Sequence, residues 1–268
     1  MIAELFVALC RVPSLKKRLW REWYEFLARR YRAADWIFMN YGYAKDDATL
    51  LRLDDHDEVD RYCIQLYNHV AGAINLRGLN VLEVGSGRGG GASFVKRYLS
   101  PAQMTGIDLS KAAVEFCQRR HPVPGLHFKV GDAEHLPFDD AWFDAVINVE
   151  SSHCYPSLPG FFSDVHRVLK PNGHFLYADL HDHNTLGEWR QCLKTAGFVI
   201  VQESDIVSNV LASLDRDNQR KLTLIDRLVP SILRPSFLNF AAVRGSRMYE
   251  AFRSGSLAYR SFVAQREI

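Results

Sequence analysis

The chain has 268 residues, which is enough for one large α/β domain or two small ones. Its hydrophobic residues (47 %) and charged residues (24 %) occur in the proportions of a soluble globular protein, which argues against a disordered or fibrous chain. The 33 basic and 31 acidic residues leave a formal net charge of +2, so the charge balance does not point to a nucleic-acid partner.

The cysteines indicate the compartment. None of the five belongs to a CxxC pair, and such a scattered, odd set is typical of free thiols in a reducing environment: Cys10, Cys63, Cys117, Cys154 and Cys192. No apolar run approaches the roughly 18 residues of a membrane span. We therefore expect a cytoplasmic protein whose contact with a membrane is at most peripheral.

Residues 1 to about 75 predict a helical N-terminal cap. They show helical rather than strand periodicity. Apolar residues recur every fourth position between basic ones: Leu15, Leu19, Trp23 and Leu27, among Lys16, Lys17, Arg18, Arg21, Arg29 and Arg30. Such a helix can lie on an anionic membrane surface. We favour the alternative, a solvated helix face packed on the core, because such faces are common.

From residue 80 onward, strands alternate with helices, which is typical of a Rossmann-like, doubly wound α/β sheet. Seven strands are predicted, at residues 80–84, 104–107, 127–130, 145–148, 174–178, 198–203 and 259–265. Helices are predicted at 92–99, 112–119, 161–169 and 186–196. We expect a parallel sheet, whose strands all end at one edge, where ligands bind.

The chain is predicted to form a single domain of four parts: the cap (1–75), a cofactor-binding core (76–204), a helical lid (205–255) and the last strand (256–268). The lid has a helical pattern from 208 to about 253, interrupted by Pro230 and Pro235. Its apolar residues predict an acceptor pocket, and the same residues could equally form a homodimer interface: Val210, Leu211, Leu222, Leu224, Ile225, Leu228, Val229, Phe237 and Phe240.

A glycine-rich turn follows the first predicted strand. Gly85, Gly87 and Gly90 match GxGxxG, a spacing that lets a ligand approach the backbone at a helix N-terminus. Asp108 ends the next strand, where its carboxylate can accept hydrogen bonds from a ribose. Both features also suit a nicotinamide dehydrogenase, so by themselves they leave two cofactors open.

Two further acids favour S-adenosylmethionine. Glu83, two residues before the first glycine, can hold an ammonium group directly or through water, whereas its charge would be unfavourable beside a pyrophosphate. Asp132 follows the third strand next to Ala133. This pair suits an adenine, because Asp132 would accept a hydrogen bond from the exocyclic amine of the base.

Residues 80 to 180 resemble a class I S-adenosylmethionine-dependent methyltransferase core. The segments VLEVGSGRGGG, GIDLS, GDAEHLPFDDAWFDAVINVES and FFSDVHRVLKPNGHFLYADL follow that family's order and spacing. The resemblance implies a set of cofactor-binding positions: Gly85, Ser86, Gly87, Asp108, Leu109, Asp132, Ala133 and Asn148. A non-catalytic cofactor-binding protein would keep these positions but lack the candidate catalytic residues.

A nearer resemblance covers most of the chain. The segments WREWYEF, FMNYGY, QRRHP and NVESSHCYP are similar to the mycobacterial phthiotriol and phenolphthiotriol dimycocerosate O-methyltransferase group. Acceptors in that group and its relatives are hydroxyls on long-chain lipids or sugars. The resemblance therefore implies methyl transfer to a lipid-like or glycosidic small molecule. It is weakest over residues 205–255, where the acceptor should bind.

His153 is the candidate general base for an alcohol acceptor, because histidine titrates near neutral pH and this one follows the fourth strand. By resemblance to sugar O-methyltransferases, Asp179 at the end of the fifth strand assists it. The alternatives are a loop histidine with ordinary partners and a capping aspartate.

Three further residues, Tyr41, His181 and His183, are candidates for the site. Tyr41, in Asn40-Tyr41-Gly42-Tyr43, can place its ring near the sulfonium or simply pack under the lid. That segment also resembles an aromatic region of sterol methyltransferases, so C-methylation of an unsaturated lipid is the alternative function. His181 and His183 can point to the same side, but two ligands fall short of a metal site, and we expect none.

Overall fold

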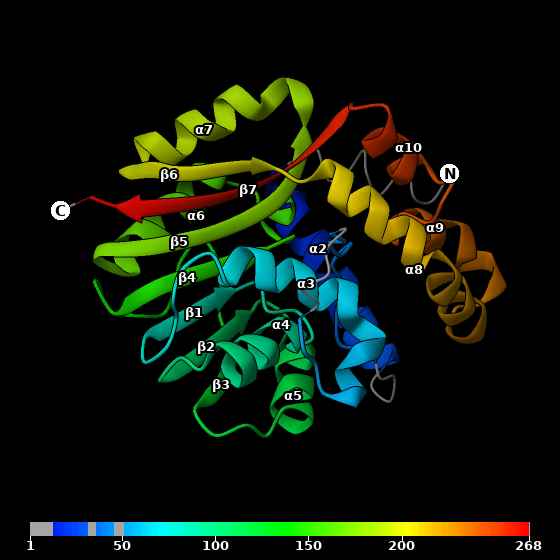
Figure 1. Ribbon diagram of the computed structural model, residues 1–268, viewed down its shortest axis with the longest axis horizontal. Helices are drawn as coiled ribbons and strands as arrows, with labels where there is room; N and C mark the ends of the chain where they lie inside the picture. Colours follow the sequence, from blue (N-terminus) through cyan, green and yellow to red (C-terminus); the bar gives the residue numbers. More distant parts are fainter. Residues whose placement is uncertain (1–12, 32–35, 46–50, 268) are drawn as a thin grey trace.

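The structure is a computed structural model, and it describes residues 13–31, 36–45 and 51–267. Its centre is a seven-stranded sheet of order β3-β2-β1-β4-β5-β7-β6 (Figure 1). The strands are β1 (Asn80–Val84), β2 (Gln103–Asp108), β3 (Leu126–Val130), β4 (Phe143–Val149), β5 (Leu169–Asp182), β6 (Phe198–Asp205) and β7 (Leu257–Arg266). The Rossmann-like, doubly wound fold is confirmed.

The sheet is mixed, which corrects the expectation of a parallel one. β1 to β5 pair in parallel, whereas β7 runs antiparallel between β5 and β6. The cause lies in the connection: the chain leaves β6 into the helical insertion and re-enters the sheet from the edge where β6 ended. A strand that starts at that edge has to run in the opposite direction.

Helices cover both faces of the sheet. The α-helices are α2 (Pro13–Arg30), α3 (Arg61–Ala71), α4 (Gly90–Phe94), α5 (Lys111–Arg120), α6 (Leu158–Val168), α7 (Leu186–Thr195), α8 (Val207–Leu228), α9 (Arg234–Phe240) and α10 (Arg247–Arg253). Short 3-10 turns are η1 (Asp55–Asp60), η3 (Ser152–Cys154), η4 (His183–Thr185) and η5 (Ser231–Leu233), and a π turn, η2 (Val95–Leu99), continues α4.

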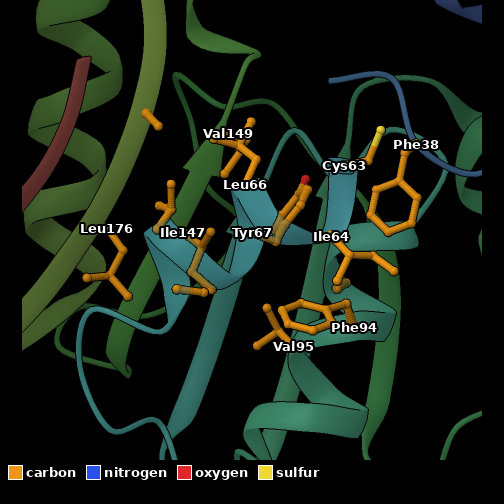
Figure 2. Packing of buried hydrophobic residues seen from close by; sticks show 14 of the residues in the cluster. Phe38, Cys63, Ile64, Leu66, Tyr67, Phe94, Val95, Ile147, Val149 and Leu176 are labelled. Carbon is orange, nitrogen blue, oxygen red and sulfur yellow. The ribbon is translucent and has the colours of Figure 1, made fainter. Parts of the chain in front are cut away.

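Alternation along the central strands divides the core in two. In β4, Ala145, Ile147 and Val149 face one cluster with α3 and α5, while Val146 faces another with α6 and α7. Figure 2 shows part of the first cluster, where side chains of α3 meet those of the strands: Ile64, Leu66, Tyr67, Ile147, Val149 and Leu176. Each fully buried aliphatic side chain contributes about 1.5–3 kcal/mol, so these layers fix the sheet edge that carries the site.

The structure differs from the predicted element bounds in three places. The strand expected at 174–178 extends over Leu169–Asp182, with an irregular pairing to β4 next to Pro171. Residues 95–99 form a π turn rather than regular helix. The 208–253 segment breaks after Leu228 into α8, η5, α9 and α10, because Pro230 cannot continue the helix.

The helices of the insertion and α2 lie around the edge where the parallel strands end. In Figure 1, α8, α9 and α10 (yellow to orange-red) form a group beyond that edge. α2 contacts α5 and η3, and its Leu27 and Trp23 pack with Phe237 of α9. α2 is thus a packed helix, which is the interpretation that we favoured.

The described cysteines are free thiols: Cys63, Cys117, Cys154 and Cys192. Cys10 lies outside the described residues. In the described part of the chain, no helix combines the length and the apolar character that a bilayer crossing needs.

Candidate active site

A cavity of about 130 Å³ lies where β1, β2 and β4 end, and α2 covers it. Most of the predicted site residues line it: Tyr41, Gly85, Ser86, Gly87, Asp108, Leu109, Asp132, Ala133 and His153. They come from separate strand ends, which the parallel sheet brings to one edge. Glu83, Asn148 and Asp179 stand directly behind this wall.

The glycine-rich turn forms the floor of the cavity. The amides of Gly85 and Ser86 donate to the Ile107 carbonyl at 2.9 and 2.8 Å, which ties the turn to β2. Gly85 has φ +77°, and a Cβ there would lie 2.3 Å from Ser151 Oγ, so only glycine fits. Ser86 Oγ is buried without a hydrogen-bond partner among the described residues. The turn therefore offers an unused polar atom.

Asp108 stands beside this turn. Its carboxylate accepts from the amides of Gly87 (2.9 Å) and Ser110 (2.8 Å), which fix its orientation. Burial raises the pKa of Asp108 to about 6 although these donors oppose it. Each carboxylate oxygen keeps a further lone pair, and Asp108 lines the cavity. This arrangement suits a diol that donates two hydrogen bonds.

Glu83 and Asn148 lie behind the turn, outside the lining of the cavity. Tyr67 Oη donates to Glu83 at 2.6 Å, and burial raises the pKa of Glu83 to about 7. The second Glu83 oxygen is buried without a partner among the described residues. The Asn148 amide donates to the Val84 carbonyl (2.9 Å) and to Ser151 Oγ (2.7 Å). Asn148 therefore holds the turn, whereas Glu83 is tied to α3 through Tyr67, and neither lines the cavity.

α2 approaches Asp132. Lys17 forms an ion pair with Asp132 and a second one with Glu134 at 3.1 Å. Further along the same helix, Glu25 accepts from Ser110 Oγ at 2.6 Å. The sequence reasoning did not foresee these contacts, because nothing in the local pattern of α2 points to a partner 85 or more residues away.

His153 and Asp179 form a hydrogen-bonded pair. His153 lies on η3 after β4, and its Nδ1 is 2.8 Å from Oδ1 of Asp179, which is fully buried in β5. The Asp179 carboxylate also accepts from Ser152 Oγ (2.5 Å) and from the amides of His153 (3.0 Å) and Leu180 (2.8 Å). β4 and β5 are neighbours in the sheet, so their ends place the two residues together.

The pair shifts both pKa values. Burial alone raises the pKa of Asp179, but the facing His153 and the other donors outweigh burial and lower it to about 2. Burial alone lowers the pKa of His153, while the Cys154 sulfur and the Asp179 carboxylate raise it well above 6.5. Asp179 therefore stays ionised at neutral pH and can only accept, so His153 Nδ1 carries the proton and Nε2 is the other titrating atom.

Glu150 is a site residue that the sequence reasoning missed. It sits at the end of β4 with φ +48° and lines the cavity. Its carboxylate accepts from the Tyr41 amide (2.8 Å) and from Tyr259 Oη (2.7 Å). Burial raises its pKa to about 7. The sequence does carry a signal for Glu150, because it is an acid at the end of a predicted strand, three residues before His153.

Tyr41 and His181 both pack against aromatic side chains. Tyr41 is buried, and its ring meets Phe252 edge to face with centroids 5.5 Å apart. The His181 ring packs on Trp189 at 3.7 Å between centroids, and burial lowers the pKa of His181 to about 4. His183 begins η4. His181 thus packs as an aromatic ring against Trp189.

Comparison with known proteins decides the family. Residues 82–177 match the family described as "Methyltransferase domain". The chain is 40 % identical over 257 residues to the phthiotriol/phenolphthiotriol dimycocerosates methyltransferase of Mycobacterium leprae, across 96 % of this chain and 95 % of that one. The chain belongs to this group of class I methyltransferases. It is a methyltransferase, and S-adenosylmethionine is its cofactor.

Two other proteins show how far the likeness extends. This methyltransferase is 40 % identical over 239 residues to the fatty-acid O-methyltransferase of Mycolicibacterium smegmatis, across 89 % of this chain and 86 % of that one. A solved structure of geranyl diphosphate C-methyltransferase from Streptomyces coelicolor, with S-adenosyl-L-homocysteine, has a TM-score of 0.70 at 18 % identity, covering 94 % of this chain and 98 % of that one. At that identity only the fold is shared.

The residues present fit the cofactor. Ser86 Oγ and one Glu83 oxygen are buried polar atoms without partners among the described residues. Asp108 presents free lone pairs to the same cavity. Such unpaired buried groups are costly unless a ligand satisfies them.

Proposed function

We propose that this methyltransferase transfers the methyl group to a hydroxyl of a lipid-like or glycosidic small molecule, with His153 as general base and Asp179 as its orienting partner. The observation that carries the proposal is the His153–Asp179 hydrogen bond of 2.8 Å at the cavity wall. The names of its relatives support a lipid acceptor: they are called phthiotriol/phenolphthiotriol dimycocerosates and fatty-acid methyltransferases.

A hydroxyl acceptor needs the pair because an alcohol is a poor nucleophile until its proton is removed. Asp179 holds the Nδ1 proton of His153, so Nε2 can take the hydroxyl proton. The imidazolium that forms is stabilised by the buried carboxylate and releases its proton to solvent afterwards. Asp179 acts through His153 and is therefore a positioning residue.

The rest of the site positions the reactants. We assign the ribose to Asp108, the adenine to Asp132, Ala133 and Leu109, and the methionine part to the turn with Glu83 behind it. When bound, the cofactor supplies an electrophilic methyl group on a sulfonium. The chain aligns the acceptor oxygen with that group and covers it with Trp20 and Tyr24 of α2, which line the cavity and limit water.

C-methylation of an unsaturated lipid is the second candidate. The observation that favours it is the presence of three aromatic side chains on the cavity wall, Trp20, Tyr24 and Tyr41, together with the Glu150 carboxylate. Such a lining stabilises a carbocation by cation–π attraction and by charge. It does not need His153 as a base.

A turnover screen with methyl-labelled cofactor tests the proposal. Long-chain diols, alkyl glycosides, long-chain phenols and long-chain alkenes without a hydroxyl are offered in parallel, and the labelled product is analysed for the new bond. We expect methyl ethers from hydroxyl acceptors. Label that enters only the alkenes would favour C-methylation, and label in neither class would overturn both candidates.

A further inference from the structure

A second cavity of about 90 Å³ adjoins the first. Its walls are largely apolar: Trp36, Leu224, Ile225, Leu228, Val229 and Phe237, mostly from α8 and α9. The segment from Phe38 to Tyr41, together with Phe240, lines both cavities. A molecule whose reacting atom lies at His153 can therefore extend past Tyr41 and Phe240 into the lid.

One cation stands out in this apolar lining. Lys221 of α8 lines the second cavity, and its Nζ lies 5.8 Å from the centroid of the Tyr41 ring. Among the described residues its hydrogen-bond partner is the Ala241 carbonyl, at a long 3.3 Å. Burial lowers the pKa of the Lys221 ammonium, which is the cost of holding a charge in such surroundings.

The neighbouring residue shows what a satisfied cation looks like here. Arg220 binds Asp217 through two bonds of 2.6 and 2.7 Å and reaches Asp60 at 3.2 Å. Within the described part of the chain, no carboxylate forms an ion pair with Lys221. Its ammonium therefore keeps hydrogen-bond donors for a group that enters the cavity.

We propose that the second cavity binds the hydrocarbon chain of the acceptor and that Lys221 binds a carbonyl oxygen, of a carboxylate or an ester, carried on that chain. This inference rests on the proposed function, since it extends the same acceptor into the lid. It makes Lys221 a specificity residue, because a chain without such an oxygen leaves the buried ammonium poorly paired.

The test is a displacement titration on the full chain saturated with S-adenosylhomocysteine. The fluorescent fatty acid cis-parinarate is the probe, and palmitate, methyl palmitate and hexadecanol compete below their aggregation concentrations. Lys221→Met should weaken palmitate about tenfold or more, because a charge-assisted hydrogen bond is lost, and leave hexadecanol within about twofold. Lys221→Arg should retain most of the preference. Lys194→Met, on an exposed part of α7, is the matched control.

Leu228→Trp and Leu224→Trp fill the cavity and should weaken the binding of every hydrocarbon chain. Unchanged S-adenosylhomocysteine affinity shows that a variant has folded. If Lys221→Met weakens the binding of palmitate alone, Lys221 binds a carboxylate oxygen. If the binding of methyl palmitate weakens as well, Lys221 also binds an ester oxygen. The inference is overturned if no chain displaces the probe, if both tryptophan variants bind chains normally, or if Lys221→Met affects palmitate and hexadecanol equally.

These outcomes separate the two proposals. If Lys221-dependent binding is found but no hydroxyl acceptor is methylated, the proposed function fails and the chain site stands. If hydroxyl acceptors are methylated with an unchanged KM in the Lys221 and Leu228 variants, the chain site fails and the proposed function stands.

Discussion

The two walls of the active-site cavity are built differently. On the sheet side, polar atoms are held by short backbone and side-chain hydrogen bonds, as Asp108 is by the amides of Gly87 and Ser110 and as His153 is by Asp179. On the helical side, α2 and α9 meet mainly through aromatic and aliphatic contacts such as Trp23 with Phe237, centroids 5.7 Å apart, and α8 lines the adjoining cavity. Its polar ties to the sheet side are a few long side chains, including Lys17.

This difference assigns different tasks to the walls. The sheet edge holds groups whose orientation decides the chemistry, and its register leaves them little freedom. The helical wall is held mainly by non-directional apolar packing, and its exposed ion pairs contribute only about 0–1 kcal/mol each. Changes on the sheet side should therefore alter rate and cofactor affinity strongly, and changes on the helical side should alter access and acceptor choice.

The largest effect is expected from His153→Ala. Loss of the general base should lower kcat by about 10²- to 10⁴-fold with a hydroxyl acceptor. Cofactor affinity, measured by calorimetry, should stay within a few-fold, since His153 faces the acceptor. His127→Ala, on the exposed side of β3, is the control. Full turnover in His153→Ala would contradict the assignment of His153 as the base. It would also contradict the view that the sheet wall carries the chemical step.

Asp179→Asn should have the next largest effect, about 10²-fold on kcat. The wild-type rate should rise with pH through the raised pKa of His153, because only the neutral imidazole accepts a proton. The asparagine variant removes the charge that raises this pKa, so the midpoint should move to lower pH. A kcat loss with an unmoved midpoint would point to a structural role for Asp179.

The same profile separates two acceptor chemistries. A carboxylate acceptor needs no base, so its rate should not rise through the pKa of His153; it should fall there if the imidazolium holds the acceptor. A long-chain alcohol and a fatty acid measured side by side on wild-type protein would show which pattern applies.

Gly85→Ala tests how rigid the sheet side is. The added Cβ would lie 2.3 Å from Ser151 Oγ at a backbone φ of +77°. Strain of this kind costs about 1–3 kcal/mol, and the displaced turn should weaken S-adenosylhomocysteine binding by about tenfold or more. Denaturant unfolding and calorimetry measure the two effects. Gly187→Ala in α7, with open space around its Cβ position, should change neither.

The smallest effect is expected from Lys17→Met on the helical wall. Its ion pairs with Asp132 and Glu134 are partly exposed, so unfolding free energy should change by less than about 1 kcal/mol. The exchange rate of S-adenosylhomocysteine, followed by stopped flow, should increase because α2 loses a tie across the cavity. A stability loss as large as that of Gly85→Ala would contradict the division between the walls.

Contacts between residues close in the sequence could be predicted from the sequence. The turn at Gly85 and the acid at Asp108 follow from a strand, a turn and a helix start, each readable over a few residues, and two further acids, Glu83 and Asp132, favoured the cofactor. The meeting of His153 with Asp179 was also foreseeable, because both end strands that a doubly wound sheet brings to one edge, although the hydrogen bond itself was not.

Tertiary structure alone decided the rest. The antiparallel direction of β7 depends on how the insertion returns to the sheet. The pairing of Lys17 with Asp132 and the placing of Lys221 beside Tyr41 each join segments more than a hundred residues apart. Hydrophobic periodicity tells which face of a helix is buried but not which distant surface it meets, because packing of apolar side chains is non-directional. The cofactor could therefore be predicted from the sequence, whereas the contacts that place Lys17 and Lys221 could not.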